Sequence, residues 1–170
     1  MAVSSESVST SGSRLVSLPA PRRRLWRYGP LILWAALIFI GSTDLLSSSN
    51  TGDVLVRPML WLFPHLSEGT LKIIQFVVRK AGHVTEYAVL ALLAARAFRT
   101  SGRELLRQRW FWVSLLLVVA YALSDEFHQS FVPSRTASIY DSMIDSLGGL
   151  TALVFVALKN GKKLRQDLHD

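Results

Sequence analysis

Apolar positions along this chain gather in four stretches, at 28–46, 73–95, 110–127 and 139–158. The second belongs to a longer predicted helix that begins after Ser67, a residue type favoured at the N-cap, and runs to about Phe98. Apolar runs of about 20 residues are typical of helices that cross a membrane. The pattern therefore predicts an all-α fold, an integral membrane bundle of about four transmembrane helices.

The first stretch has the weakest apolar signal. Its uninterrupted core covers only 31–40, and it reaches a membrane-spanning length only when it is extended to 28–46. A cleaved signal peptide is the rival interpretation, but the basic leader is too long and no small-residue cleavage site follows. We therefore expect an uncleaved first helix.

Polar segments separate the four stretches and set the domain boundaries. Residues 1–21 are rich in Ser and predict disorder, so we expect a basic tail at 1–27, a transmembrane domain at 28–158 and a second basic tail at 159–170. The loop at 47–66 contains an apolar part at 54–63. Because Pro58 and Pro64 interrupt it, we expect an interfacial or re-entrant segment there. Breaks at 100–102 and 128–138 complete the division.

Composition agrees with a membrane protein. Half of the residues are hydrophobic and only 18% are charged, with a mean hydropathy of +0.31, whereas soluble domains carry about 25% charged residues. The chain has no cysteine, which excludes disulfides, thiolate metal sites and a cysteine nucleophile. The net charge of +7 comes from short basic blocks beside apolar runs. That placement favours orientation in a bilayer over nucleic-acid binding.

Most of the 19 Lys and Arg residues fall in three segments: the N-terminal tail, the 96–109 region and the C-terminal tail. An even number of spans places all three on the same side, and the positive-inside rule makes that side cytoplasmic. We therefore expect both termini in the cytoplasm. If the first stretch did not span, the block of Arg22, Arg23 and Arg24 would lie outside, so the charge pattern supports this helix.

This topology brings ionisable residues together near the outer leaflet, from three helices and one loop. The residues concerned are Arg79, Lys80, His83, Glu86 and Tyr87, then Asp125, Glu126, His128 and Gln129, then Arg135, Asp141 and Asp145. An ionised group inside a membrane costs several kcal/mol unless it is paired or faces a cavity. The deeper members, His83, Glu86 and Asp145, therefore need partners or a ligand.

Four interpretations of this cluster stay open. Pairing of Arg79 or Lys80 with Glu86, and of Asp141 with Arg135, would make it structural. A metal site is a second interpretation, but neither HExxH nor paired ExxH motifs occur. In a phosphate site, the cations would bind a lipid phosphate while Glu126 or Asp141 acts as the base. A proton or ion path along Glu86, His83 and Asp145 is the fourth, and four helices would need to oligomerise to form it.

Two motifs carry a resemblance to a known family. The segment RKAGHVTEYAVL at 79–90 is one half of the match, and DEFHQSFVPSR at 125–135, followed by Asp141 and Gly148, is the other. FIGS at 39–42 and the serines at 47–49 also fit. Together they resemble the VanZ-like family of bacterial membrane proteins over roughly residues 30–158. Two positions depart from the family pattern, Asp145 where Asn is frequent and Ser134 where Gly is usual.

The resemblance implies a multi-pass protein of the bacterial inner membrane and cell envelope, in a family whose founding member is associated with resistance to the glycopeptide teicoplanin. It names no reaction and no cofactor. Our leading expectation is binding or modification of a lipid-linked phosphate, such as a polyprenyl phosphate, at the outer leaflet. The groups expected to act in acid–base chemistry are Glu126, Asp141, His83, Glu86 and His128. Those expected to bind the ligand are Lys80, Arg135, Gln129, Asp125 and Tyr87. The alternatives are a non-enzymatic structural component and a small proton-coupled transporter.

Overall fold

The fold is all-helical in the part of the chain that the computed structural model describes, residues 20–43, 57–132 and 138–166. The labelled helices are α1 (Ala20–Gly41), α3 (Glu68–Arg99), α4 (Glu104–Gln108), α5 (Trp110–Gln129) and α6 (Ile139–Gln166). A short unlabelled helix covers residues 57–62. No strand occurs among the described residues. The predicted fold class is therefore confirmed at the level of an all-helical protein.

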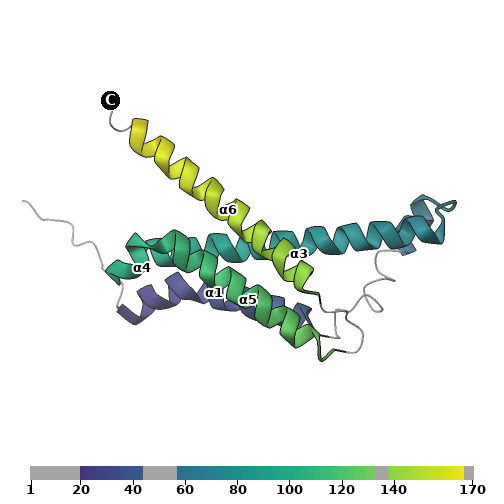
Figure 1. Ribbon diagram of the computed structural model, residues 1–170, viewed down its shortest axis with the longest axis horizontal. Helices are drawn as coiled ribbons and strands as arrows, with labels where there is room; N and C mark the ends of the chain where they lie inside the picture. Colours follow the sequence, from purple (N-terminus) through teal and green to yellow (C-terminus); the bar gives the residue numbers. More distant parts are fainter. Residues whose placement is uncertain (1–19, 44–56, 133–137, 167–170) are drawn as a thin grey trace, which may run out of the picture.

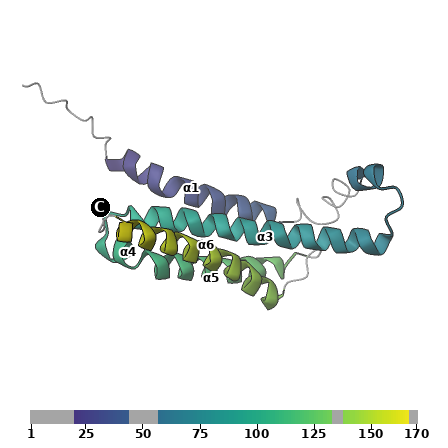
Figure 2. The same ribbon diagram turned by 90° about the horizontal axis from the view of Figure 1, so that it is seen from above.

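Helix α3 is the centre of the arrangement and contacts each of α1, α4, α5 and α6. Figure 2 shows α1 along one side of α3, with α5 and α6 on the other side. In Figure 1, α6 crosses α3 diagonally and its C-terminal part diverges from the other helices. The first half of α6 is therefore the half that packs closely in the bundle.

The observed helices differ from the predicted ones at several ends. Helix α1 begins at Ala20, before the expected start at residue 28, so its arginines lie within the helix. Helix α6 continues past the expected end at residue 158 to Gln166. The five-residue helix α4 lies in a segment predicted to be a loop. The long helix was predicted closely, and Ser67 caps it by accepting a hydrogen bond from the N–H of Thr70.

Two adjacent glycines allow α6 to approach its neighbours closely. A Cβ atom added to Gly148 would lie 2.8 Å from the carbonyl oxygen of Val84 on α3. At Gly149 the added atom would lie 2.6 Å from a methyl carbon of Val118 on α5. Neither position has room for a side chain, so the glycines set the packing of α6 against both α3 and α5.

Side-chain hydrogen bonds attach α1 to the rest of the bundle. The Tyr28 hydroxyl lies 3.0 Å from the Ser101 hydroxyl, near the start of the bundle. Further along α1, the Trp34 indole donates to the carbonyl oxygen of Glu86 at 2.9 Å. The Tyr121 hydroxyl donates to the carbonyl oxygen of Ala35. These bonds fix the height and rotation of α1 against α3 and α5.

Helix α3 is much longer than its neighbour α5. Its 32 residues extend about 48 Å at 1.5 Å per residue, against about 30 Å for the 20 residues of α5. The N-terminal part of α3 projects beyond the bundle, and residues 57–62 lie at its far end (Figures 1 and 2). Ile73, Phe76 and Val77 are exposed on this projection. The end of the bundle thus falls near Lys80, where the first polar contacts begin.

Candidate functional site

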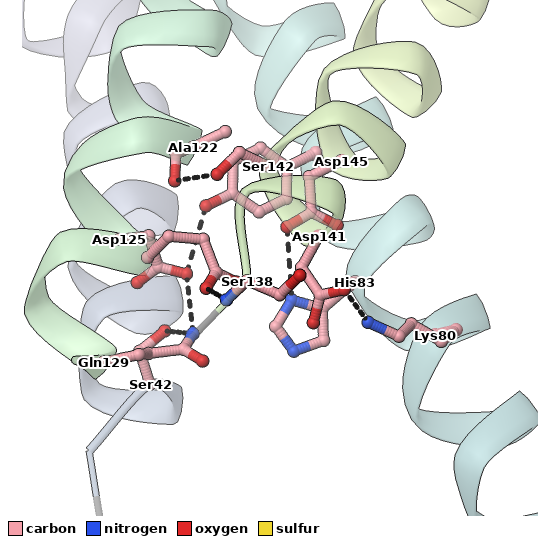
Figure 3. Close-up of polar contacts among 12 residues, drawn as sticks. Ser42, Lys80, His83, Ala122, Asp125, Gln129, Ser138, Asp141, Ser142 and Asp145 are labelled. Atoms are coloured by element: carbon pink, nitrogen blue, oxygen red, sulfur yellow. Dashed lines mark hydrogen bonds and ion pairs between the residues drawn. The ribbon is translucent and has the colours of Figure 1, made fainter. Parts of the chain in front are cut away.

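A polar cluster lies at the end of the bundle from which α3 projects. Figure 3 shows its side chains converging from α3, α5, α6 and the residue after α1. The cluster comprises Ser42, Lys80, His83, Tyr87, Asp125, Glu126, Gln129, Asp141, Ser142 and Asp145, with the backbone of Ser138. Its deepest members are buried, and Tyr87 is fully buried at 0% exposure. Polar side chains therefore meet inside the bundle as well as at its surface.

Asp125 is the centre of one hydrogen-bond network. Its Oδ2 atom accepts from the Tyr87 hydroxyl at 3.1 Å and from the Gln129 side-chain amide at 3.1 Å. The same amide lies 3.4 Å from the Ser42 hydroxyl, beyond the end of α1. Gln129 follows Asp125 by four residues, which places both on the same face of α5. One carboxyl group thus connects α1, α3 and α5.

Glu126 connects α5 to the start of α6. Its Oε2 atom accepts a hydrogen bond of 2.8 Å from the N–H of Ser138, the residue immediately before α6. In a capping box, a Glu within the helix performs this role. Here the carboxyl group comes from the neighbouring helix instead. A negative charge at this position is also favoured by the helix dipole.

Two ion pairs join α3 to α6. The Lys80 ammonium pairs with the Asp141 carboxylate, and both side chains are partly exposed. One turn deeper, His83 Nδ1 lies 3.5 Å from Asp145 Oδ2, a contact that is ionic only when His83 is protonated and that is too long for a hydrogen bond. Asp145 is almost fully buried at 2% exposure. The steps from Lys80 to His83 and from Asp141 to Asp145 keep the two pairs aligned along the helices.

One alternative left open by the sequence paired Arg79 or Lys80 with Glu86, and in the structure Lys80 pairs with Asp141. Glu86 is half-buried, and its backbone carbonyl accepts the bond from Trp34 on α1. The His128 ring lies against Phe39 of α1, with ring centroids 4.5 Å apart. The structure therefore turns His128 toward α1. Arg135, with Ser134 beside it, lies outside the described residues.

Three contributors were not among the predicted site residues. Ser42 and Ser142 reach the cluster through their hydroxyls, and Ser142 lies 3.5 Å from the Ala122 carbonyl oxygen. Ser138 contributes only its backbone N–H. A signal for Ser142 was present in the sequence, because it lies three residues before Asp145 on the same helix face. A backbone contribution such as that of Ser138 has no sequence signature.

Polar partners lie beside the carboxyl groups of the cluster, but the buried atoms Asp125 Oδ1 and Asp145 Oδ2 accept no hydrogen bond from the part of the chain that is described. Asp125 has Tyr87 and Gln129, Glu126 has the Ser138 amide, and Asp141 and Asp145 face Lys80 and His83. The cluster is therefore not a bare patch of negative charge. The described residues contain no group of three or more His, Asp or Glu side chains placed to hold a metal ion. The chemistry present is that of paired acids, one ammonium and one imidazole.

Two helices in the described part, Trp110–Gln129 and Ile139–Gly161, are long and apolar enough to cross a membrane. Large apolar side chains are also exposed on the outside of α1, α3 and α5. These features define a helical membrane protein with a polar cluster at one end. A family model described as VanZ/LLP1 matches residues 28–160, and the chain belongs to this family. No curated protein and no solved structure gives a significant match.

Proposed function

We propose that this protein is a multi-pass protein of the bacterial inner membrane that binds a lipid-linked phosphate at the outer leaflet. Helices α1, α3, α5 and α6 are its four spans, and both termini are cytoplasmic. The basic segments support this orientation, because an even number of spans places all of them on the cytoplasmic side. The polar cluster then faces the outside, at the level of the lipid headgroups.

The observation that carries the proposal is the position of Lys80 at the rim of the cluster. Its ammonium has three N–H donors, so the ion pair with Asp141 does not exhaust its bonding capacity. The side chain is partly exposed, whereas Asp125 and Asp145 beneath it are buried. A phosphate arriving from the membrane surface therefore meets Lys80 and its partner Asp141 before it meets the deeper carboxyl groups. Arg135 provides the second cation in this proposal.

Glu126 and Asp141 are the acid–base groups if the bound lipid is also modified. Glu126 is held by the Ser138 amide and Asp141 by Lys80, so both carboxyl groups have fixed positions. His83 contacts Asp145 beside them, and Gln129, Asp125 and Tyr87 shape the interior of the site, whereas His128 lies against α1. The resemblance to the VanZ-like family supports susceptibility to glycopeptides such as teicoplanin as the envelope process affected.

Native mass spectrometry of the protein in mild detergent tests the proposal. We expect a polyprenyl phosphate to remain bound to the wild-type protein and to be lost from the Lys80→Ala and Arg135→Ala variants. Lys72→Ala is the matched control, since Lys72 is exposed on the projecting part of α3. A bare wild-type protein would contradict the proposal. So would glycopeptide susceptibility that is unchanged in cells carrying Glu126→Gln and Arg135→Ala.

A structural role is the second candidate, favoured by one specific observation. The network of Tyr87, Asp125, Gln129 and Ser42 links three helices through hydrogen bonds alone. If stability were its whole purpose, substitutions in the cluster would lower protein abundance and thermal stability without a separate loss of lipid binding. Measuring the melting temperature of each variant beside its bound lipid separates the two candidates.

A further inference from the structure

An apolar groove of about 580 Å³ lies between α3 and α6. This volume is within the range of about 300–1,000 Å³ typical of small-molecule sites. The groove is lined by Val84, Ala88, Leu92, Ile144, Leu147, Gly148, Thr151, Ala152 and Phe155. Thr151 is its one polar side chain, and the Thr151 hydroxyl is occupied by a bond to the Leu147 carbonyl oxygen. The interior therefore offers almost only hydrocarbon contact.

The crossing of the two helices forms this groove. On α3, Val84, Ala88 and Leu92 follow one another in steps of four residues, which is one ridge of a helix. The helices are closest at Gly148, which has no side chain to hold Val84 away. They then diverge toward the C-terminal part of α6 (Figure 1). Leu147 and Phe155 are exposed at its margin, so the groove opens to the bilayer.

The Lys80–Asp141 ion pair lies about one helical turn beyond the residues that line the groove. Lys80 precedes Val84 by one helical turn, and Asp141 precedes Ile144 by nearly one turn. The ion pair therefore lies at the N-terminal end of the lining residues on both α3 and α6. Arg79 is exposed next to Lys80 and adds a positive charge at the same level. A ligand that fits this arrangement has a hydrocarbon chain with an anionic group at one end.

We propose that this groove binds the hydrocarbon chain of a polyprenyl phosphate, which enters sideways from the bilayer with its phosphate at Lys80. The inference rests on the proposed function and adds the part of the lipid that is recognised. A single groove between two helices accommodates one chain, and a polyprenyl phosphate has one chain where a phospholipid has two. The Lys80 ammonium at the rim can bind a phosphate in addition to Asp141, whereas an apolar helix of a second copy of the chain offers it no negative charge.

Variants that fill the groove test this inference. Ala88→Leu and Ala152→Leu place methyl and methylene groups where the chain would lie. The matched control is Ala120→Leu, because Ala120 is exposed on α5 and does not line the groove. The probes are a long-chain polyprenyl phosphate, dimethylallyl phosphate and phosphatidylglycerol, each titrated into the full-length protein in phosphatidylcholine nanodiscs. Affinity is measured by native mass spectrometry, and folding is checked by the melting temperature.

We expect both groove variants to bind the long-chain probe about tenfold more weakly, the loss expected when roughly two methylene groups are no longer buried. Binding of dimethylallyl phosphate, whose chain is too short to follow the groove, stays unchanged in them and falls in Lys80→Ala. If Ala88→Leu binds the long-chain probe as tightly as the wild-type protein does, the groove does not bind the chain. That result leaves the proposed phosphate site at Lys80 untouched. No binding of any phosphate probe to the wild-type protein overturns the proposed function as well.

The inference would also be contradicted if the groove bound a two-chain phospholipid equally well or held a second copy of the chain. Equal binding of phosphatidylglycerol and the long-chain polyprenyl phosphate would show that the groove does not select a single chain. A wild-type dimer that becomes a monomer in Ala88→Leu, but not in Ala120→Leu, would identify a second copy of the chain as the occupant. Native mass spectra distinguish both results from the expected one, because bound lipid and a second subunit differ in mass.

Discussion

The location of Asp125 could be predicted from the sequence, but not every partner of its carboxyl group could. Its position near the end of a membrane helix predicted a location close to the outer leaflet. The structure adds that its carboxyl group is buried and held by Tyr87 and Gln129. Gln129 was within reach of prediction, because it lies four residues further along the same helix. Tyr87 was not, since its contact depends on the depth and rotation of α3 relative to α5.

The Tyr87 hydroxyl leads to a prediction about stability. Tyr87→Phe removes one of the two donors to Asp125 Oδ2, which keeps its bond from the Gln129 amide, and a single hydrogen bond contributes about 0.5–1.5 kcal/mol. We expect the free energy of unfolding to fall by that amount. Thermal denaturation in detergent, monitored by circular dichroism, measures the change. Tyr140→Phe is the control, because Tyr140 is exposed, and an equal loss in both variants would contradict the role given to Tyr87.

Lys80 shows the same limit of sequence reasoning for charged residues. The sequence suggested a partner on its own helix, Glu86, whereas the observed partner is Asp141 on α6. Lys80 and Glu86 are six residues apart on α3, about 120° around the helix, so spacing alone does not place their side chains together. A pair between α3 and α6 requires the crossing point of the two helices. Gly148 and Gly149 allow the close approach of α6 at that crossing, because an added Cβ at either residue would clash with a neighbouring helix.

Helices as elements were easier to predict than their ends. The apolar stretches identified α1, α3, α5 and α6, because each has a long run of hydrophobic residues. The helical state of 20–27 was missed because charged residues there gave no apolar signal, although arginine itself favours a helix. The extension of α6 beyond residue 158 was missed for the same reason, since lysines and polar residues follow. Hydropathy locates the membrane-spanning part, not the whole helix.

Packing between elements gives a second prediction. In Gly148→Ala and Gly149→Ala, the new methyl group would meet Val84 and Val118, so α6 must move away from α3 or α5. Overpacking of this kind costs about 1–3 kcal/mol, and we expect a lower melting temperature in both variants. Gly82→Ala is the matched control within a helix. Nothing lies within 4 Å of its added Cβ, and alanine favours a helix by about 1 kcal/mol over glycine.

A result in which Gly82→Ala destabilises the protein as much as Gly149→Ala would contradict this account of α6 packing. The same variants also probe the groove, because Gly148 lies on its floor. Separation of α3 and α6 would widen the groove and weaken the Lys80–Asp141 pair together. Melting temperature and lipid binding should therefore fall together in Gly148→Ala.

At the scale of the whole molecule, the proposed topology predicts which residues are reached from each side of the membrane. The chain has no cysteine, so single cysteine substitutions give a clean signal. We expect Ser130→Cys, exposed at the polar end of the bundle, to react with a membrane-impermeant maleimide in intact spheroplasts. Gly102→Cys, exposed at the opposite end of α3, should react only after permeabilisation. The reverse pattern would contradict the orientation.

The orientation was open to prediction from basic residues, but the depth of the polar cluster was not. Charge counting assigns loops to a side without stating how far each helix projects. Helix α3 extends well beyond the end of α5, and this projection carries exposed apolar residues such as Ile73 and Phe76. Only the relative heights of the helices, fixed by contacts such as Tyr87 with Asp125, show that the cluster begins at Lys80.

The hydrogen bond from Ser138 to Glu126 has a consequence for how the protein is made. Ribosomes deliver α5 before α6, so the acceptor for the first turn of α6 has been synthesised before the donor. The backbone N–H that precedes α6 therefore gains its protein acceptor only once α6 lies beside α5. The cap of α6 thus depends on a residue of the helix that is synthesised before it, and α6 is most stable when it is packed against α5.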